Sequence, residues 1–151
     1  MVHKNLQKKY KIIDHIADIG IKVQGNSLKD IYENSAYALF DIISDIKSIQ
    51  PLNRRKIIAT GENKEYLLVS WLSELLYIFD TKKMLFSKFE IKNLTKSNIS
   101  ADIFGEPYVK GKHILKCEIK AITYHQLEIK QSKAKKVLLK PFWEAQVIFD
   151  V

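Results

Sequence analysis

The chain has 151 residues, of which 46% are hydrophobic, and this suffices for a single domain with a buried core. Its formal net charge is +8, yet all of its 25 basic residues except Arg54 and Arg55 are lysines. Specific recognition of phosphates and bases favours arginine, so we interpret the lysine excess as compositional bias. No apolar run is long enough to span a bilayer, no signal peptide is recognisable, and the single cysteine excludes an internal disulfide. These features predict a cytoplasmic protein.

The N-terminal part of the chain predicts two strands followed by a helix. Residues 9–14 and 18–25 have the apolar alternation of strands, which is clearest in the second segment. Ser27 is a suitable N-cap for a helix over residues 28–46, and Asp30 follows it at the spacing of a capping box.

The rest of the chain predicts one more helix and several strands. A short strand is expected over residues 54–60, and a helix with a wide apolar stripe over residues 64–80. Further strands are expected over residues 84–93, 98–104, 116–130 and 143–150. Because strands and helices do not alternate regularly, we predict an α+β fold. Two helices would pack on a mainly antiparallel sheet, in a single domain over residues 1–151.

Two residues of the expected 116–130 strand carry reactive side chains. The common phosphate-binding, metalloprotease and serine-hydrolase motifs are absent from the sequence. Cys117 falls on the apolar face of this strand, so we interpret it as buried filling and not as a nucleophile. His125 shares that face, and we favour a hydrogen-bonded core histidine over a functional one.

Acidic residues remain as candidates for a metal site. In one continuous strand Asp14 and Asp18 would lie about 13 Å apart, too far to share an ion directly. Either the chain turns between them, or only one is a ligand. Asp150 stands beside Val151, so an acid and the chain-terminal carboxylate are adjacent and repel each other unless a cation intervenes. If the 18–25 strand starts beside the end of the last strand, Asp18 and Asp150 meet there.

Five blocks of the sequence follow the order and spacing of one protein family. They are DHIADIGIKVQGNSLKDIYENSAYALFDI (14–42), LLVSWLSELLYIFD (67–80), FGEPY (104–108), EIKAITYHQLEI (118–129) and AQVIFDV (145–151). On these blocks the chain resembles the archease family, small proteins that assist the RtcB-type tRNA-splicing ligase. The segment over residues 110–120 departs from the family's pattern.

The resemblance implies an archease-type α+β fold and a non-catalytic role. The protein would activate the ligase that joins 3′-phosphate to 5′-hydroxyl RNA ends, by promoting its guanylylation and multiple turnover. It would reach tRNA only indirectly, through the ligase, and would not act at a membrane. The resemblance also implies a divalent cation held by Asp18, Asp150 and a main-chain oxygen of Val151. Ca²⁺ is the expected ion, and Mg²⁺ or Mn²⁺ are the alternatives. Asp14 would support these ligands without contacting the ion. Asp41 and His125 match recurring family positions that carry no assigned role.

Two other functions compete with the accessory role. The charge of +8 suggests a stand-alone basic RNA-binding module, although the sequence lacks the RNP-type aromatic strand and the GXXG loop of common modules. A small metal-dependent hydrolase would use Asp18 and Asp150 as ligands and His125 as the base. A site with two acids offers little to orient a substrate, which disfavours this alternative.

Overall fold

The computed structural model describes residues 9–15, 17–132 and 142–151. The elements, in chain order, are β1 (Tyr10–His15), β2 (Asp18–Gly25), α1 (Leu28–Ile43), the 3₁₀ helix η2 (Ile46–Ser48), β3 (Asn53–Thr60), α2 (Lys64–Lys82), β4 (Met84–Leu94), β5 (Asn98–Pro107), β6 (Ala121–Ile122), β7 (Glu128–Ser132) and β8 (Phe142–Asp150). All of these strands pair antiparallel. The predicted α+β class is therefore confirmed.

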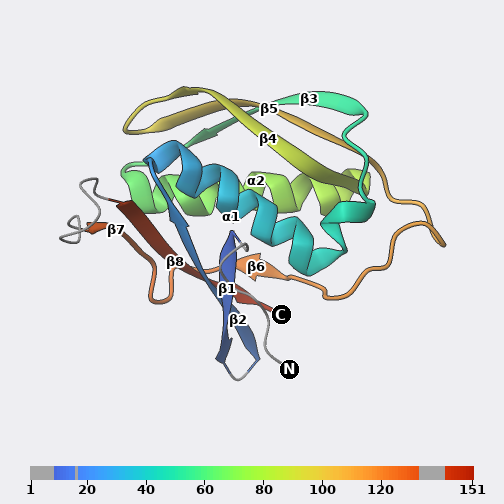
Figure 1. Ribbon diagram of the computed structural model, residues 1–151, viewed down its shortest axis with the longest axis horizontal. Coiled ribbons are helices and arrows are strands. Elements are labelled where there is room, and N and C mark those ends of the chain that lie inside the picture. The colour runs from blue at the N-terminus through green and yellow to red at the C-terminus, as the bar shows by residue number, and fades with distance from the viewer. Residues whose placement is uncertain (1–8, 16, 133–141) are drawn as a thin grey trace.

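The strands form two sheets, with the helices between them. One sheet has five strands in the order β1-β2-β8-β6, with β7 also paired to β8, and the other has three in the order β3-β5-β4. In Figure 1 the three-stranded sheet lies above the helix pair and the five-stranded sheet below it. Helix α1 contacts β2 and β4, and α2 contacts β3 and β6. The sequence predicted one sheet, whereas the structure has two sheets on opposite sides of the helices.

Burial on two sides explains the wide apolar stripe of α2. Its buried residues are Leu67, Leu68, Val69, Trp71, Leu72, Leu75, Leu76, Ile78 and Phe79, which cover more than one face of the helix. A helix packed against a single sheet needs only a narrower stripe. Even so, no helix in the described part of the chain has the length and apolarity to cross a membrane.

Helix α1 begins where the sequence predicts and ends earlier. The Ser27 hydroxyl accepts a hydrogen bond from Asp30 N–H at 3.1 Å, and the Asp30 carboxylate accepts one from Asn26 N–H at 2.9 Å. The helix stops at Ile43 because Ser44 has extended backbone angles. The Ser44 hydroxyl donates to the Ile114 carbonyl at 2.7 Å, which holds the helix end against a distant loop. This tertiary contact leaves no local trace in the sequence.

The prediction of one long strand over residues 116–130 is wrong. Only β6 and β7 are strands there, and a turn at residues 125–126 separates them, with Gln126 at a left-handed φ of 51°. Both strands pair with β8, so the chain follows one edge of the sheet with an interruption. Burial is interrupted as well: Ile119, Ile122 and Ile129 are buried, whereas Ala121 and residues 124–126 are exposed. The apolar alternation of the sequence therefore does not correspond to one buried face in this segment.

Candidate functional site

The pairing of β2 with β8 brings the two predicted metal ligands together. Asp18 is the direct cross-strand partner of Asp150. The Asp150 carbonyl accepts from Lys120 N–H at 2.8 Å, and Val151 N–H donates to the Ala17 carbonyl at 3.4 Å. The main-chain groups of Asp150 therefore point toward β6. The Asp18–Asp150 pair is thus of the non-hydrogen-bonded kind, in which Cα atoms lie about 4.5 Å apart and side chains are closest.

Hydrophobic burial fixes this register. Ile21 and Val23 on β2, and Val147 and Phe149 on β8, have no exposed surface and face the helices. A slip of one residue in either strand would turn these side chains to the outside. The alternate residues, which include both aspartates, consequently occupy the opposite face of the five-stranded sheet.

The two aspartates form an acidic spot at the ends of β2 and β8. Both are half-buried, and neither belongs to an ion pair among the described residues. Within residues 9–15, 17–132 and 142–151, no group of three acidic, histidine or cysteine side chains is arranged to hold a metal. The pair supplies two carboxylates, to which main-chain oxygens or water can add. An all-oxygen donor set fits a hard divalent cation such as Ca²⁺.

Asp14 and Val151 flank the pair in different ways. In the register of β1 with β2, Asp14 lies opposite Ile19, and His15 lies opposite Asp18. Because Ile19 alternates with Asp18, the register sets Asp14 on the other face of the sheet from the pair and sets His15 on the same face. Val151 directly follows Asp150, and its side chain is half-buried against the hydrophobic core. Val151 thus adds main-chain atoms beside the site while its side chain packs elsewhere. The sequence alone assigned no role to His15, which the register places beside the pair.

Asp41 does not join the pair and has a structural role. Its carboxylate accepts from the Tyr10 hydroxyl at 2.7 Å and from Ile46 N–H at 3.2 Å. It therefore ties β1 to the end of α1. Burial raises the pKa of the Tyr10 hydroxyl above its ordinary value, and the hydrogen bond to Asp41 raises it further.

The expectation of a core position for His125 is wrong. The residue is exposed and lies in the turn between β6 and β7. Its neighbour Gln126 accepts a hydrogen bond from the Gln146 side-chain amide at 3.1 Å, at a point four residues along β8 from Asp150. That distance is about 13 Å along a strand, so the hydrolase that would use His125 as its base is disfavoured.

Cys117 is half-buried against the core, less than the buried position expected, and its segment is not a strand. Burial raises the pKa of the Cys117 thiol, and the nearby Glu118 raises it further. A raised pKa lowers the fraction of reactive thiolate, which agrees with the interpretation that this cysteine is not a nucleophile.

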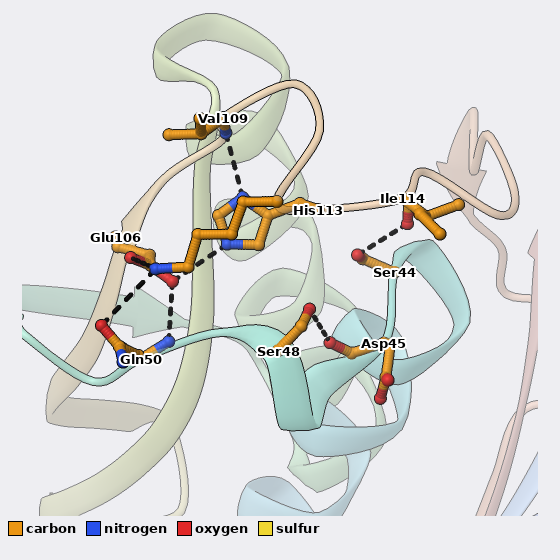
Figure 2. Close-up of polar contacts among 9 residues, drawn as sticks. Ser44, Asp45, Ser48, Gln50, Glu106, Val109, His113 and Ile114 are labelled. Atoms are coloured by element: carbon orange, nitrogen blue, oxygen red, sulfur yellow. Dashed lines mark hydrogen bonds and ion pairs between the residues drawn. The ribbon is translucent and has the colours of Figure 1, made fainter.

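A buried polar cluster that the sequence analysis missed lies around Glu106 (Figure 2). Glu106 and His113 are 6% and 2% exposed. The Glu106 carboxylate accepts from Gln50 N–H at 2.8 Å and Lys112 Nζ at 2.6 Å, and lies 2.9 Å from His113 Nε2. Because Val109 N–H donates to His113 Nδ1 at 2.9 Å, Nε2 carries the proton and donates to Glu106. Burial alone would raise the pKa of Glu106, but these hydrogen bonds outweigh it and hold the pKa at about 2.

This cluster anchors the segment that leads to β6. Beyond His113, the Ile114 carbonyl accepts from Ser44, and Lys116 N–H donates to the Ile43 carbonyl at 2.8 Å. The segment then reaches Lys120, whose N–H bonds the carbonyl of Asp150. The cluster thus helps to position the strand beside the aspartate pair. Glu106 belongs to the matching block 104–108, whereas Lys112 and His113 lie within residues 110–120, where the sequence departs from the family's pattern.

Together these features define a small α+β protein whose two sheets enclose a helix pair, with an acidic candidate cation site where β2 begins and β8 ends. A family model described as the Archease protein family (MTH1598/TM1083) matches residues 10–151. The chain therefore belongs to the archease family.

Individual relatives cover nearly the whole chain. Protein archease of Methanosarcina acetivorans is 37% identical over 148 residues, which are 95% of this chain and 97% of that protein. Protein archease of Pyrococcus abyssi is 35% identical over 148 residues, or 95% of this chain and 99% of that protein. The solution structure of Methanobacterium thermoautotrophicum protein 1598 has a TM-score of 0.75 and 30% identity, covering 96% of this chain and 100% of that one.

Proposed function

We propose that this protein is a cytoplasmic, non-catalytic accessory factor of an RtcB-type RNA ligase. It would promote guanylylation of the ligase and allow multiple turnovers in joining 3′-phosphate to 5′-hydroxyl tRNA ends. Membership of the archease family supports this role. The observation that carries the proposal is the register that sets Asp18 opposite Asp150, because it assembles the acidic pair that the role is expected to need.

The proposal includes a divalent cation, most simply Ca²⁺. Asp18, Asp150 and an oxygen of Val151 would hold it. Asp14 would have at most a supporting role, because the register sets it on the other face of the sheet. When bound, the cation would offset the repulsion between the two carboxylates. The protein's own residues would present that charged end of β8 to the ligase, and the RNA would be contacted through the ligase.

The test is a single-turnover guanylylation assay with the RNA ligase of the same organism and GTP. Adding this protein should speed formation of the ligase–GMP adduct, and Asp150→Ala should lose that stimulation. Glu144→Ala is the matched control. It removes an acid from the same strand, one that pairs with Lys130 at 3.8 Å and accepts a hydrogen bond from Gln24 at 3.0 Å, and it should stimulate normally.

The possible outcomes of this assay separate two claims. If the unaltered protein does not change the guanylylation rate, the accessory role is wrong. If the protein stimulates but Asp150→Ala stimulates equally well, the accessory role stands and the cation site is misassigned.

A stand-alone RNA-binding module is the second candidate, and one surface favours it. On the three-stranded sheet Lys88 Nζ lies 5.0 Å from the centre of the Phe104 ring, and Arg54 is the cross-strand partner of Phe104. Aromatic and basic side chains on a sheet are typical of single-strand binding. Acidic residues already pair with these basic side chains. Lys88 Nζ lies 3.2 Å from Glu90 Oε2, and Arg54 Nη1 lies 3.8 Å from Asp102 Oδ2. We therefore rank this function second.

A further inference from the structure

An open hollow of about 400 Å³ lies beside the N-terminal half of α2. We call it the tyrosine hollow, because Tyr66 on the first turn of α2 and Tyr124 after β6 both line it. Glu62, Glu74 and two serines of α2, Ser70 and Ser73, also line it. None of the residues of the candidate cation site lines it, so this surface has no place in the function proposed above.

The two tyrosines form a corner of exposed aromatic surface. Their ring centres are 5.1 Å apart, and the ring planes meet at 68°. Tyr66 remains 46% exposed and Tyr124 61% exposed, although both carry large apolar rings. Tyrosine in this half-open state is typical of binding surfaces, because it offers a broad apolar face at a small cost in conformational entropy.

The backbone on each side holds this corner in place. Tyr66 N–H donates to the side chain of the N-cap residue Asn63 at 2.9 Å, which fixes the first turn of α2. Just before Tyr124, Thr123 N–H donates to the Ile148 carbonyl at 3.0 Å, which fixes the end of β6 against β8. The two rings are therefore presented by anchored elements, so little ordering is needed when a ligand binds.

The tyrosine hollow is acidic in a basic protein. Glu62 and Glu74 line it, and among residues 9–15, 17–132 and 142–151 no lysine, arginine or histidine does. Neither glutamate takes part in an ion pair within the described part of the chain. Against a net charge of +8, two carboxylates that share a hollow with two aromatic rings attract a positively charged group.

We propose that the tyrosine hollow receives an arginine side chain presented by a protein partner. A guanidinium group stacks on the face of a tyrosine and also forms paired hydrogen bonds with a carboxylate, so one side chain satisfies both features of the hollow. A lysine ammonium is more strongly hydrated and cannot match the carboxylate geometry. Arginine and tyrosine, together with tryptophan, are enriched among the residues that contribute most to protein interfaces.

The test is an NMR titration of the ¹⁵N-labelled full chain with the peptide acetyl-Gly-Arg-Gly-amide. Saturable shifts are expected for the amides of Glu62, Tyr66 and Tyr124, and they should weaken as salt is raised. The Tyr124→Ala variant, and separately the double Glu62→Gln, Glu74→Gln variant, should weaken binding by about two- to fivefold.

Two control variants remove equivalent groups from α2 outside the hollow. Tyr77→Ala deletes a tyrosine that is 62% exposed, and Asp80→Asn neutralises an exposed acid. Both should bind the arginine peptide like the unaltered protein. Thermal melts of all variants establish that a loss of binding is not a loss of folding.

Several results would overturn the inference. The peptide would be excluded as a ligand by the absence of saturable shifts at the hollow, or by equal shifts with citrulline in place of arginine. Equal affinity for a lysine peptide would overturn the assignment to arginine. Shifts at the hollow that depend on protein concentration alone would identify a second copy of the chain as the occupant. The ligase takes no part in this titration, so its outcome is separate from that of the guanylylation assay.

Discussion

At the scale of single residues, Asp18 and Asp150 owe their proximity to their hydrophobic neighbours and gain nothing from each other without a cation. We therefore predict that Ca²⁺ raises the melting temperature of the unaltered protein and that Asp150→Ala abolishes this rise. A ligand at a hundred times its dissociation constant stabilises by about 2.7 kcal/mol, which gives a readily measured shift. In EDTA the variant should be at least as stable as the unaltered protein, because it lacks the like-charge repulsion.

The control for this experiment is Val151→Ile. Only the main chain of Val151 is assigned to the cation, and its side chain packs against the core, so a slightly larger aliphatic residue should keep the calcium effect. Thermal melts in Ca²⁺ and in EDTA measure both variants. A calcium-dependent rise that survives in Asp150→Ala would disprove the assignment.

Glu106 gives a prediction about pH. Its pKa of about 2 lies below the ordinary value of 4.5, so its ionised form is favoured by folding. A lowered carboxyl pKa adds stability above the unfolded value, and that stability is lost as the pH falls from about 4.5 toward 2. Glu106→Gln should therefore cost about 2 kcal/mol at pH 7, and the difference from the unaltered protein should shrink below pH 4.

Denaturant unfolding at several pH values measures this difference. Glu90→Gln is the matched control, because Glu90 also has a lowered pKa, caused by hydrogen bonds from Lys88 and Lys92 on an exposed face. Exposed charges are screened by solvent, so this variant should leave stability nearly unchanged. A Glu106→Gln cost that stays constant from pH 7 to pH 2 would contradict the role assigned to the ionised carboxylate.

At the scale of elements, the pairing of β4 with β5 depends on Gly105. A Cβ atom at this position would lie 1.8 Å from the Leu85 carbonyl oxygen and 2.7 Å from Phe86 Cα, and backbone atoms cannot move aside cheaply. We predict that Gly105→Ala lowers the free energy of unfolding by about 3 kcal/mol. For comparison, Gly111→Ala meets no atom within 4 Å and pays only for a φ of +93°, so its loss should be about 1 kcal/mol. Urea unfolding measures both, and equal losses would argue against the close approach at Gly105.

The elements also show what the sequence could predict. Segments with strong periodicity were found nearly to their ends, such as β2 over Asp18–Gly25 and the start of α1 after Ser27. Periodicity reports which side chains are buried and not which backbone groups are paired. Residues 116–130 alternate in sequence like one strand, but the chain joins the ladder only at Ala121–Ile122 and again from Glu128, with a turn at residues 125–126 between them.

The candidate site was predictable for a related reason. Alternation along β2 and β8 placed Asp18 and Asp150 on polar faces, and the family resemblance suggested that these ends meet. The Glu106–His113 pair had no comparable signal, because it joins β5 to a loop through contacts that only the folded chain creates. The division into two sheets was hidden as well, since burial of a helix does not reveal what covers each side.

At the scale of the whole molecule, the two candidate functions predict different roles for the net charge of +8. The RNA-binding module needs this charge for binding, whereas the accessory factor does not. If the lysine excess is compositional, neutralising Lys133, Lys135 and Lys136 should barely change stimulation of the ligase at moderate salt. These residues lie outside the described part of the chain, and fields of exposed charges are screened within about 8 Å. The guanylylation assay measures this effect, and a large loss would locate a contact with RNA or ligase in that segment.

Direct binding to tRNA completes this test of the charge. An RNA-binding module should bind tRNA tightly without the ligase, and its affinity should fall steeply with salt as counterions are released. An accessory factor should bind tRNA weakly under the same conditions. We expect the weak result in a mobility-shift titration at rising salt, with little further change when Lys88→Gln is made beside Phe104. Tight binding that Lys88→Gln weakens would favour the module, because an interaction with solvated lysines alone would not depend on one side chain over an aromatic ring.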